Sequence, residues 1–277
     1  MTFLAASPLG DVGEPDVIIH GIPYDGAVSW RAGASGGPAE IRHASGSLET
    51  YSARLRRDLG EVVLADAGDL DIQGNTGEGL FRLIAERTAA LARRTELVVT
   101  LGGDHSISMG TSAGLRTVHE ELAHVVFDAH MDMRPDWDGD PWSHACGTRR
   151  MAAAGPTCAL GIRSGSRQEF ADADRMLAAW SEAIEPTDAL RAVIDGRPVF
   201  ISIDLDVLDP SILPGTGNPE PGGPGYRDLR EAAFAVIEGG RVVGIDLVEV
   251  APTIDGTAVS ATVAAALARD LILAATS

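Results

Sequence analysis

The chain of 277 residues contains no lysine: its 22 basic residues are all arginine, against 40 acidic residues, and the formal net charge is −18. Phosphate contacts need clustered Lys or Arg, and anionic membranes attract the same residues. An acidic chain without a basic run is therefore a poor candidate for binding nucleic acid or a membrane surface. The charge favours solubility and suits a high-salt or a high-GC source, and composition does not choose between these two.

Cysteine and long apolar runs are also scarce. Cys146 and Cys158 cannot build a disulfide framework, so we expect a reducing, cytoplasmic location. The N-terminal segment MTFLAASPLGDVGEP lacks the basic start of a signal peptide. The longest apolar stretch, 258–274, is interrupted by Arg269 and Asp270, so it predicts a buried C-terminal helix rather than a membrane span.

Short apolar runs alternate with longer helical segments, and hydrophobic residues make up 45% of the chain, as in ordinary globular proteins. Most runs are continuously apolar, which is typical of parallel strands covered by helices on both faces. The expected strands are 17–21, 61–65, 97–101, 124–129, 158–162, 199–204 and 242–246, and the expected helices are 77–94, 106–122, 168–181, 187–195, 227–238 and 257–273. Thr187 and Thr257 are the expected N-caps of two of these helices. With no repeat or linker, the pattern predicts one α/β domain over residues 1–277 with an open, mostly parallel sheet.

Polar side chains gather just after four of the apolar runs. The carboxyl ends of strands in an open α/β sheet form the ligand crevice, so we expect these side chains at one edge. His105 follows the run 97–101, and Glu249 follows the run 242–246. Asp128, His130 and Asp132 lie around the end of the run 124–129, and Asp204 and Asp206 around the end of the run 199–204.

The segment Asp128-Ala129-His130-Met131-Asp132 is the strongest local signal. In an extended chain, alternate residues point to one face about 6.6 Å apart, so the two carboxylates would flank the histidine. Two carboxylates at a buried strand end repel each other unless a cation lies between them. A solvent-exposed strand end is the alternative, but the preceding apolar HVVF argues against it.

The segment Ser202-Ile203-Asp204-Leu205-Asp206 repeats this arrangement, and in an extended chain its two aspartates share a face. Turn chemistry before Asp209-Pro210 could also explain them. His105 follows a Gly-Gly pair, where a lone histidine is more often structural than a ligand.

Taken together, the clusters offer two histidines and four aspartates. One divalent ion needs three or four protein ligands, so six suit two ions that share carboxylates. Imidazole and carboxylate without thiolate favour manganese over zinc or copper. Two ions about 3.5–4 Å apart can hold a hydroxide at near-neutral pH, and such a hydroxide is a nucleophile for hydrolysis. We expect the three clusters to lie within about 12 Å of one another, in one cleft.

Six segments resemble the ureohydrolase family, which includes arginase, agmatinase, guanidinobutyrase, proclavaminate amidinohydrolase and formiminoglutamase. They are GASGGPAEIR at 33–42, GGDHSIS at 102–108, DAHMD at 128–132, SIDLDVLDP at 202–210, PGTGNPEPGG at 214–223 and GIDLVEV at 244–250, in the family's order. The resemblance implies a three-layer α/β/α fold with a central parallel sheet. It also implies two Mn²⁺ per chain, hydrolysis of a guanidino compound to urea and an amine, and a homotrimer or homohexamer.

The resemblance also implies a role for each residue of the site. A metal-bridging hydroxide would attack the guanidinium carbon, and Asp132 would accept a hydrogen bond from it. The implied ligands are His105 and Asp132 for the first ion, His130 and Asp206 for the second, and Asp128 and Asp204 bridging both.

Two further residues match the family's substrate-handling positions. Glu249 is similar to the acid that contacts the guanidinium, through charge-assisted hydrogen bonds to its planar N–H groups. His144 in WSHACGTRR resembles the loop histidine that protonates the leaving amine. A histidine near its unperturbed pKa of about 6.5 can give and regain a proton at neutral pH. The Gly- and Pro-rich loop at 214–223 is expected to form a wall of the site.

Substrate choice depends on the loop after Asp132. Arginases carry an asparagine two residues beyond that aspartate, whereas this chain has Arg134, which is similar to agmatinase-type members. The acids Asp136, Asp138 and Asp140 could attract the amine tail of agmatine. Arg134 could instead pair with the carboxylate of a guanidino acid such as guanidinobutyrate. Agmatine is the favoured substrate, and another guanidino or formimino compound is the alternative.

Two other classes of protein remain as hypotheses. A single-zinc deacetylase of related architecture needs one Asp-x-His and one further Asp, and would leave His105, Asp132 and Asp206 without a role. A non-catalytic descendant that binds a ligand or partner would be marked by lost ligands, and none of the six is missing. The complete set therefore favours a dimetal amidinohydrolase.

Overall fold

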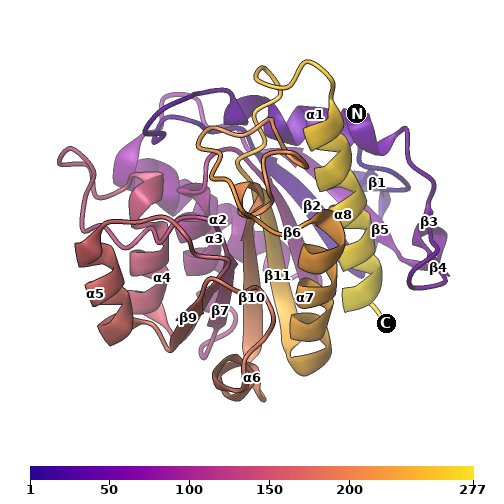
Figure 1. Cartoon of the computed structure of the whole chain (residues 1–277). Coiled ribbons are helices and arrows are strands. Elements are labelled where there is room, and N and C mark those ends of the chain that lie inside the picture. The colour runs from indigo at the N-terminus through magenta and orange to yellow at the C-terminus, as the bar shows by residue number, and fades with distance from the viewer.

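Nine strands form one sheet in the order β1-β5-β2-β6-β11-β10-β7-β8-β9, and every neighbouring pair is parallel (Figure 1). The computed structural model describes all residues from Met1 to Ser277. The strands of this sheet are β1 Ser7–Pro8, β2 Val17–Ile22, β5 Leu64–Asp69, β6 Leu97–Gly102, β7 Ala123–Phe127, β8 Thr157–Leu160, β9 Ala179–Ser181, β10 Pro198–Asp204 and β11 Arg241–Val248. A separate antiparallel pair is formed by β3 Tyr51–Ser52 and β4 Arg57–Asp58.

Helices cover both faces of the sheet, which confirms the predicted α/β class (Figure 1). On one face α8 packs against both α1 and α7, and α7 packs against α6; on the other, α2, α3, α4 and α5 pack in succession. The helices are α1 Gly37–Ser45, α2 Gly77–Ala92, α3 Ile107–Arg116, α4 Gly147–Ala154, α5 Arg167–Met176, α6 Asp188–Ile194, α7 Tyr226–Gly239 and α8 Val259–Ala275.

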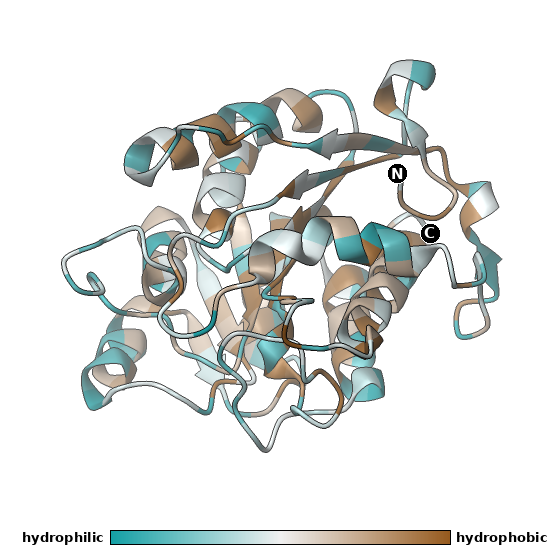
Figure 2. Cartoon of the chain, turned by 90° about the horizontal axis from the view of Figure 1, so that it is seen from above, coloured by the Kyte–Doolittle hydropathy of each residue, from teal (hydrophilic) through white to brown (hydrophobic).

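The core lies on both sides of the sheet because successive strand residues point to opposite faces. Ile19 and Ile201 belong to the cluster that packs under α7 and α8, whereas their neighbours Ile18 and Phe200 belong to the cluster under the other helices. All four side chains are fully buried. In Figure 2 the strands in the interior are largely brown or pale, whereas the helices and loops around them carry both teal and brown segments. This explains why the strands read as continuous apolar runs.

The four strands expected to carry the polar clusters are β6, β11, β10 and β7, and they are consecutive neighbours in the middle of the sheet. Because they are parallel, their carboxyl ends lie at one edge. The helices lack the combination of length and hydrophobicity that a membrane span requires.

Several element boundaries differ from the predicted ones. The predicted helix at 168–181 ends at Met176, because Leu177 is extended and the chain continues into the edge strand β9, paired with β8. The predicted strand at 61–65 begins only at Leu64, since Leu59–Glu61 form a 3₁₀ turn. The predicted helix at 106–122 ends at Arg116. Helices α1 and α4 were not predicted, because both begin at glycines that read as loop.

The two N-cap predictions had different outcomes. Thr187 caps α6, and its side chain accepts a hydrogen bond from the N–H of Leu190. Thr257 does not cap α8, which starts one residue later, after Ala258 in the left-handed conformation. Asp255 replaces it, because its carboxylate accepts from the N–H and hydroxyl of Ser260 in the first turn.

Gly103, directly before the Asp104-His105 pair, lies against the backbone of the loop that follows β2. A Cβ at this position would lie 1.7 Å from the carbonyl oxygen of Tyr24. The same oxygen accepts a hydrogen bond from the N–H of Asp104 at 2.7 Å. Only glycine therefore lets this loop approach the end of β6.

We predict that Gly103→Ala lowers the free energy of unfolding by about 1–3 kcal/mol, because the loop must move away from an overpacked contact. Urea unfolding followed by circular dichroism measures the change. Gly10→Ala is the matched control, since a Cβ there meets no atom within 4 Å. Equal unfolding midpoints for the two variants would contradict the close approach at Gly103.

Candidate active site

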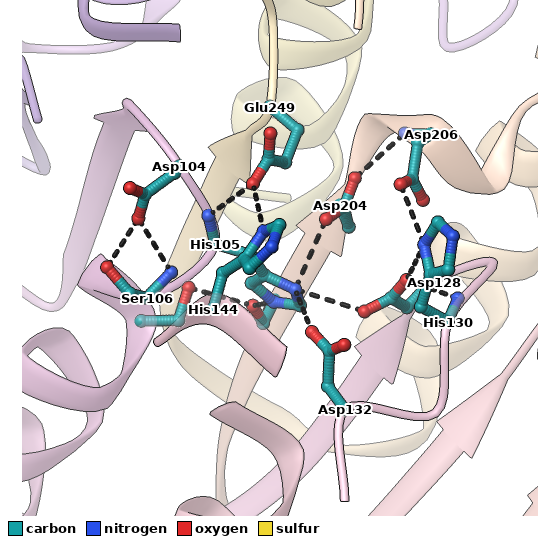
Figure 3. Close-up of polar contacts among 12 residues, drawn as sticks. Asp104, His105, Ser106, Asp128, His130, Asp132, His144, Asp204, Asp206 and Glu249 are labelled. Carbon is teal, nitrogen blue, oxygen red and sulfur yellow. Dashed lines mark hydrogen bonds and ion pairs between the residues drawn. The ribbon is translucent and has the colours of Figure 1, made fainter. Parts of the chain in front are cut away.

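The three clusters meet at the carboxyl edge of the sheet, with His105 at the centre of the first group (Figure 3). Its Nδ1 atom lies 3.0 Å from Asp128 Oδ2, 3.2 Å from Asp204 Oδ2 and 3.5 Å from Asp132 Oδ2. These residues come from the ends of three strands in the middle of the sheet, β6, β10 and β7, with β11 between β6 and β10. The ligand atoms of His105, Asp128 and Asp132 lie within 4.8 Å of one another, close enough to hold one ion together.

His130 is the centre of a second group that shares Asp128 with the first. Its Nδ1 atom lies 3.0 Å from Asp206 Oδ2 and 3.6 Å from Asp128 Oδ1. Figure 3 shows the two histidines on opposite sides of Asp128. The arrangement has the form of two adjoining ion sites with a shared carboxylate.

The local backbone differs from the extended chain expected for these segments. Asp132 has a φ of 50°, in the left-handed region, and Asp206 lies in the 3₁₀ turn Leu205–Val207. Turns rather than alternating strand positions therefore aim these carboxylates at the histidines. Glu249 also has a positive φ of 66°. Strained backbone of this kind concentrates at functional sites, where the surrounding structure holds it.

The carboxylates of the cluster repel one another strongly. Burial raises the pKa of Asp204 well above its usual range, and the charges of Asp206 and Asp128 raise it further. Burial and the charge of Asp128 likewise raise the pKa of Asp132 to about 6. Burial alone would lower the pKa of His105, but the surrounding aspartates raise it well above the usual value. Each shift reports a shortage of positive charge that bound cations would relieve.

The donor set fits divalent cations. His105 Nδ1 and Asp128 Oδ2 are buried side-chain atoms without a hydrogen-bond partner. Adjacent ligands of an ion bound at about 2.0–2.2 Å lie roughly 3 Å apart, close to the spacings here. Imidazole and carboxylate ligands without thiolate suit manganese and similar ions.

A buried hydrogen-bond chain determines which nitrogen of His105 faces the aspartates. Ser202 Oγ donates to Asp246 Oδ1 at 2.8 Å, so it accepts from His105 Nε2 at 3.0 Å. Because Nε2 then carries the proton, the lone pair of Nδ1 points at the carboxylates. Asp246 and Ser202 are fully buried and hold this tautomer.

Glu249 and His144 form a second unit beside the aspartates. Glu249 Oε1 accepts from the N–H of His105 at 2.8 Å and lies 3.2 Å from His144 Nδ1. His144 is 8% exposed and starts the 3₁₀ turn His144–Cys146, so it is held in place. Burial lowers its pKa, but Glu249, Asp132 and Asp104 outweigh this effect and raise it to about 9. The expectation of an unperturbed pKa is therefore wrong, since three carboxylates surround the ring.

A cavity of about 350 Å³ opens beside these residues. The predicted wall from the 214–223 loop contributes Asn218. Arg134 also lines the cavity, but its guanidinium lies 3.3 Å from Glu169 Oε2 and stacks 4.8 Å from the ring of Trp137. Arg134 is thus partly neutralised rather than free.

Several lining residues were not predicted from the sequence, among them Ser29, Trp137 and Glu169. Ser166 and Glu169 form a capping box at the start of α5. Their spacing, a serine followed three residues later by a glutamate, could have predicted the start of this helix. Ser29 carried no such signal, because its contacts depend on loops that meet only in the folded chain.

We predict that Asp246→Asn weakens divalent-cation binding about 10–100-fold, because an amide can donate to Ser202 and reverse the hydrogen-bond chain. Calorimetric titration of the ion-free protein with Mn²⁺ measures the affinity. Asp270→Asn is the control, since this buried aspartate on α8 pairs with Arg230 and Arg269 and does not line the cavity. Equal affinities for both variants would contradict the role of Asp246.

Comparison with known proteins points in one direction. A model described as the arginase family matches residues 15–274. Agmatinase of Bacillus subtilis (strain 168) is 35% identical over 277 residues, covering 98% of this chain and 95% of that protein. N(1)-aminopropylagmatine ureohydrolase of Thermococcus kodakarensis is 34% identical, covering 88% of this chain and 85% of that protein.

Solved structures show the same relationship. Agmatine ureohydrolase of Thermoplasma volcanium superposes with a TM-score of 0.84 at 31% identity, covering 95% of this chain and 90% of that one. Proclavaminate amidino hydrolase from Streptomyces clavuligerus gives a TM-score of 0.88 at 26% identity, covering 99% and 96%. The chain therefore belongs to the arginase family and is a ureohydrolase.

Proposed function

We propose that this ureohydrolase uses two Mn²⁺ ions to hydrolyse agmatine to urea and an amine. The observation that carries the proposal is the pair of histidine–aspartate groups sharing Asp128, beside Glu249 and His144. The ions, when bound, supply a water nucleophile of near-neutral pKa and stabilise developing negative charge. The proposed ligands are His105 and Asp132 for one ion, His130 and Asp206 for the other, with Asp128 and Asp204 shared.

Glu249 is proposed to bind and orient the guanidinium. Its Oε1 atom already accepts from His105 N and contacts His144 Nδ1, so Oε2 is the oxygen left to accept a guanidinium N–H. A charge-assisted bond of this kind fixes the plane of the substrate next to the aspartates. His144 is proposed to provide the proton that the leaving nitrogen needs as the C–N bond breaks.

The contacts of Arg134 favour an amine tail over a carboxylate tail. Arg134 is already paired with Glu169, which weakens its attraction for the carboxylate of a guanidino acid. Glu169 Oε1 accepts only the N–H of Met133, at 3.3 Å, and Glu169 lines the cavity. An ammonium group can therefore donate a hydrogen bond to this oxygen without displacing Arg134.

A second candidate substrate is N(1)-aminopropylagmatine, the substrate named for one group of relatives. It would carry a further amine beyond the agmatine skeleton. Asp136, Asp138 and Asp140 are exposed on the segment that carries Trp137, and could attract that amine. Loop acids are usually only solvated, so agmatine remains the first proposal.

We predict that the Mn²⁺-loaded enzyme releases urea from agmatine with a kcat/KM at least about tenfold above that for guanidinobutyrate or arginine, because neither carboxylate tail finds a free cation. A urea-release assay with these compounds and aminopropylagmatine measures the preference, with formamide release followed for formiminoglutamate. A preference for guanidinobutyrate would show that Arg134 binds a carboxylate. No turnover of any compound would contradict the proposed reaction.

A further inference from the structure

Both ring nitrogens of His144 are already engaged by the protein. Nδ1 lies 3.2 Å from Glu249 Oε1. Nε2 lies 3.0 Å from the hydroxyl oxygen of Ser29 and 3.1 Å from the backbone nitrogen of the same residue. To hand a proton directly to a substrate, the ring would have to rotate and break these contacts.

Ser29 is the group that connects His144 to the cavity. Its hydroxyl oxygen also accepts from Asn218 Nδ2 at 2.8 Å, and all three residues line the cavity. A hydroxyl has two lone pairs and one proton. When Nε2 is protonated, Nε2–H and Nδ2–H occupy both lone pairs, so the O–H of Ser29 is free to donate to a substrate.

The loop that carries Ser29 is fixed on both sides of it. Before Ser29, the N–H of Ala27 donates to Asp104 Oδ2 at 3.0 Å, and Ser143 Oγ donates to the carbonyl of Ala27 at 3.2 Å. After Ser29, Arg31 donates to the carbonyls of Gly217 and Thr216 at 2.9 and 2.7 Å. These bonds join the loop to the segments that carry His144 and Asn218, so the contact between Ser29 and His144 is built into the fold.

We propose that Ser29 is a catalytic residue that relays the proton from His144 to the leaving nitrogen, an inference that rests on the hydrolysis proposed above. As the C–N bond breaks, the nitrogen keeps the electron pair and takes the hydroxyl proton of Ser29. At the same time Oγ takes the proton from His144 Nε2, so the hydroxyl is restored. The ring is left neutral, with its remaining proton on Nδ1 facing Glu249, and regains the lost proton from solvent.

The backbone N–H of Ser29 supports this direction of transfer. At 3.1 Å from Nε2 it can donate only to an unprotonated nitrogen. It therefore stabilises the ring in the state reached after the proton has left. One residue thus accepts the proton through its side chain and stabilises the deprotonated ring through its backbone.

The test compares Ser29→Ala and Ser29→Thr in the Mn²⁺-loaded enzyme with agmatine as substrate. Ser29→Ala is expected to lower kcat by about 10–10²-fold while KM stays within about threefold and both ions stay bound. Ser29→Thr keeps the hydroxyl and is expected to retain most of kcat. Ser35→Ala is the control, because it removes a hydroxyl that bonds to Asp25 on the same loop and does not contact His144.

A double-mutant cycle tests whether Ser29 works through His144. In a His144→Ala background, Ser29→Ala is expected to cost no further rate, because the relay has already lost its source. The proposal is overturned if Ser29→Ala keeps wild-type kcat, raises only KM or loses the ions, or if Ser29→Thr is as slow as Ser29→Ala. It is also overturned if the rate losses of Ser29→Ala and His144→Ala multiply in the double variant.

A spectroscopic measurement separates this proposal from the proposed reaction. In ion-free protein with ¹⁵N-labelled histidine, the Nε2 resonance of His144 is expected to shift in Ser29→Ala and to stay unchanged in Ser35→Ala. An unshifted resonance overturns the relay whether or not any substrate turns over. Failure of the wild-type enzyme to release urea contradicts the reaction, while a shifted resonance still supports the contact between Ser29 and His144.

Discussion

Mutual repulsion among four buried aspartates is the constraint on which the rest of the site depends. Asp128, Asp204 and Asp206 are almost fully buried and lie within reach of the same two histidines, and Asp132 is 8% exposed. No arginine pairs with any of them. Buried like charges are tolerated only with a compensating cation. The apolar core on both faces of the sheet stabilises the fold against this repulsion. The central strands β6, β11, β10 and β7 hold the aspartates together at their carboxyl ends.

Three loops around the aspartates carry side chains that the proposed reaction needs in addition to the cations. Ser143 and Arg31 join the loop after β2 to the turn that carries His144 and to the 214–223 loop. Together these loops bring Ser29, His144 and Asn218 to the cavity that Glu249 also lines. In the proposed reaction the cations supply the nucleophile, Glu249 binds the guanidinium, and the loops provide the groups that move the proton.

The sequence predicted the fold class and the residues that converge, because both leave local signals: continuous apolar strands, and paired acids at strand ends. It did not predict how the convergence is achieved. Asp132 and Asp206 reach the histidines through a left-handed residue and a 3₁₀ turn, which alternating-face geometry does not describe. The raised pKa of His144 and its contact with Ser29 were also beyond the sequence, since both depend on residues more than 100 positions apart. Helices α1 and α4 were hidden by the glycines at their starts.

We propose that the aspartate cluster holds two cations that share Asp128. Anomalous diffraction from crystals grown with Mn²⁺ would locate them. Two peaks per chain are expected, about 3.5–4 Å apart, with the carboxylate of Asp128 between them. One peak, or two peaks that do not share Asp128, would contradict it.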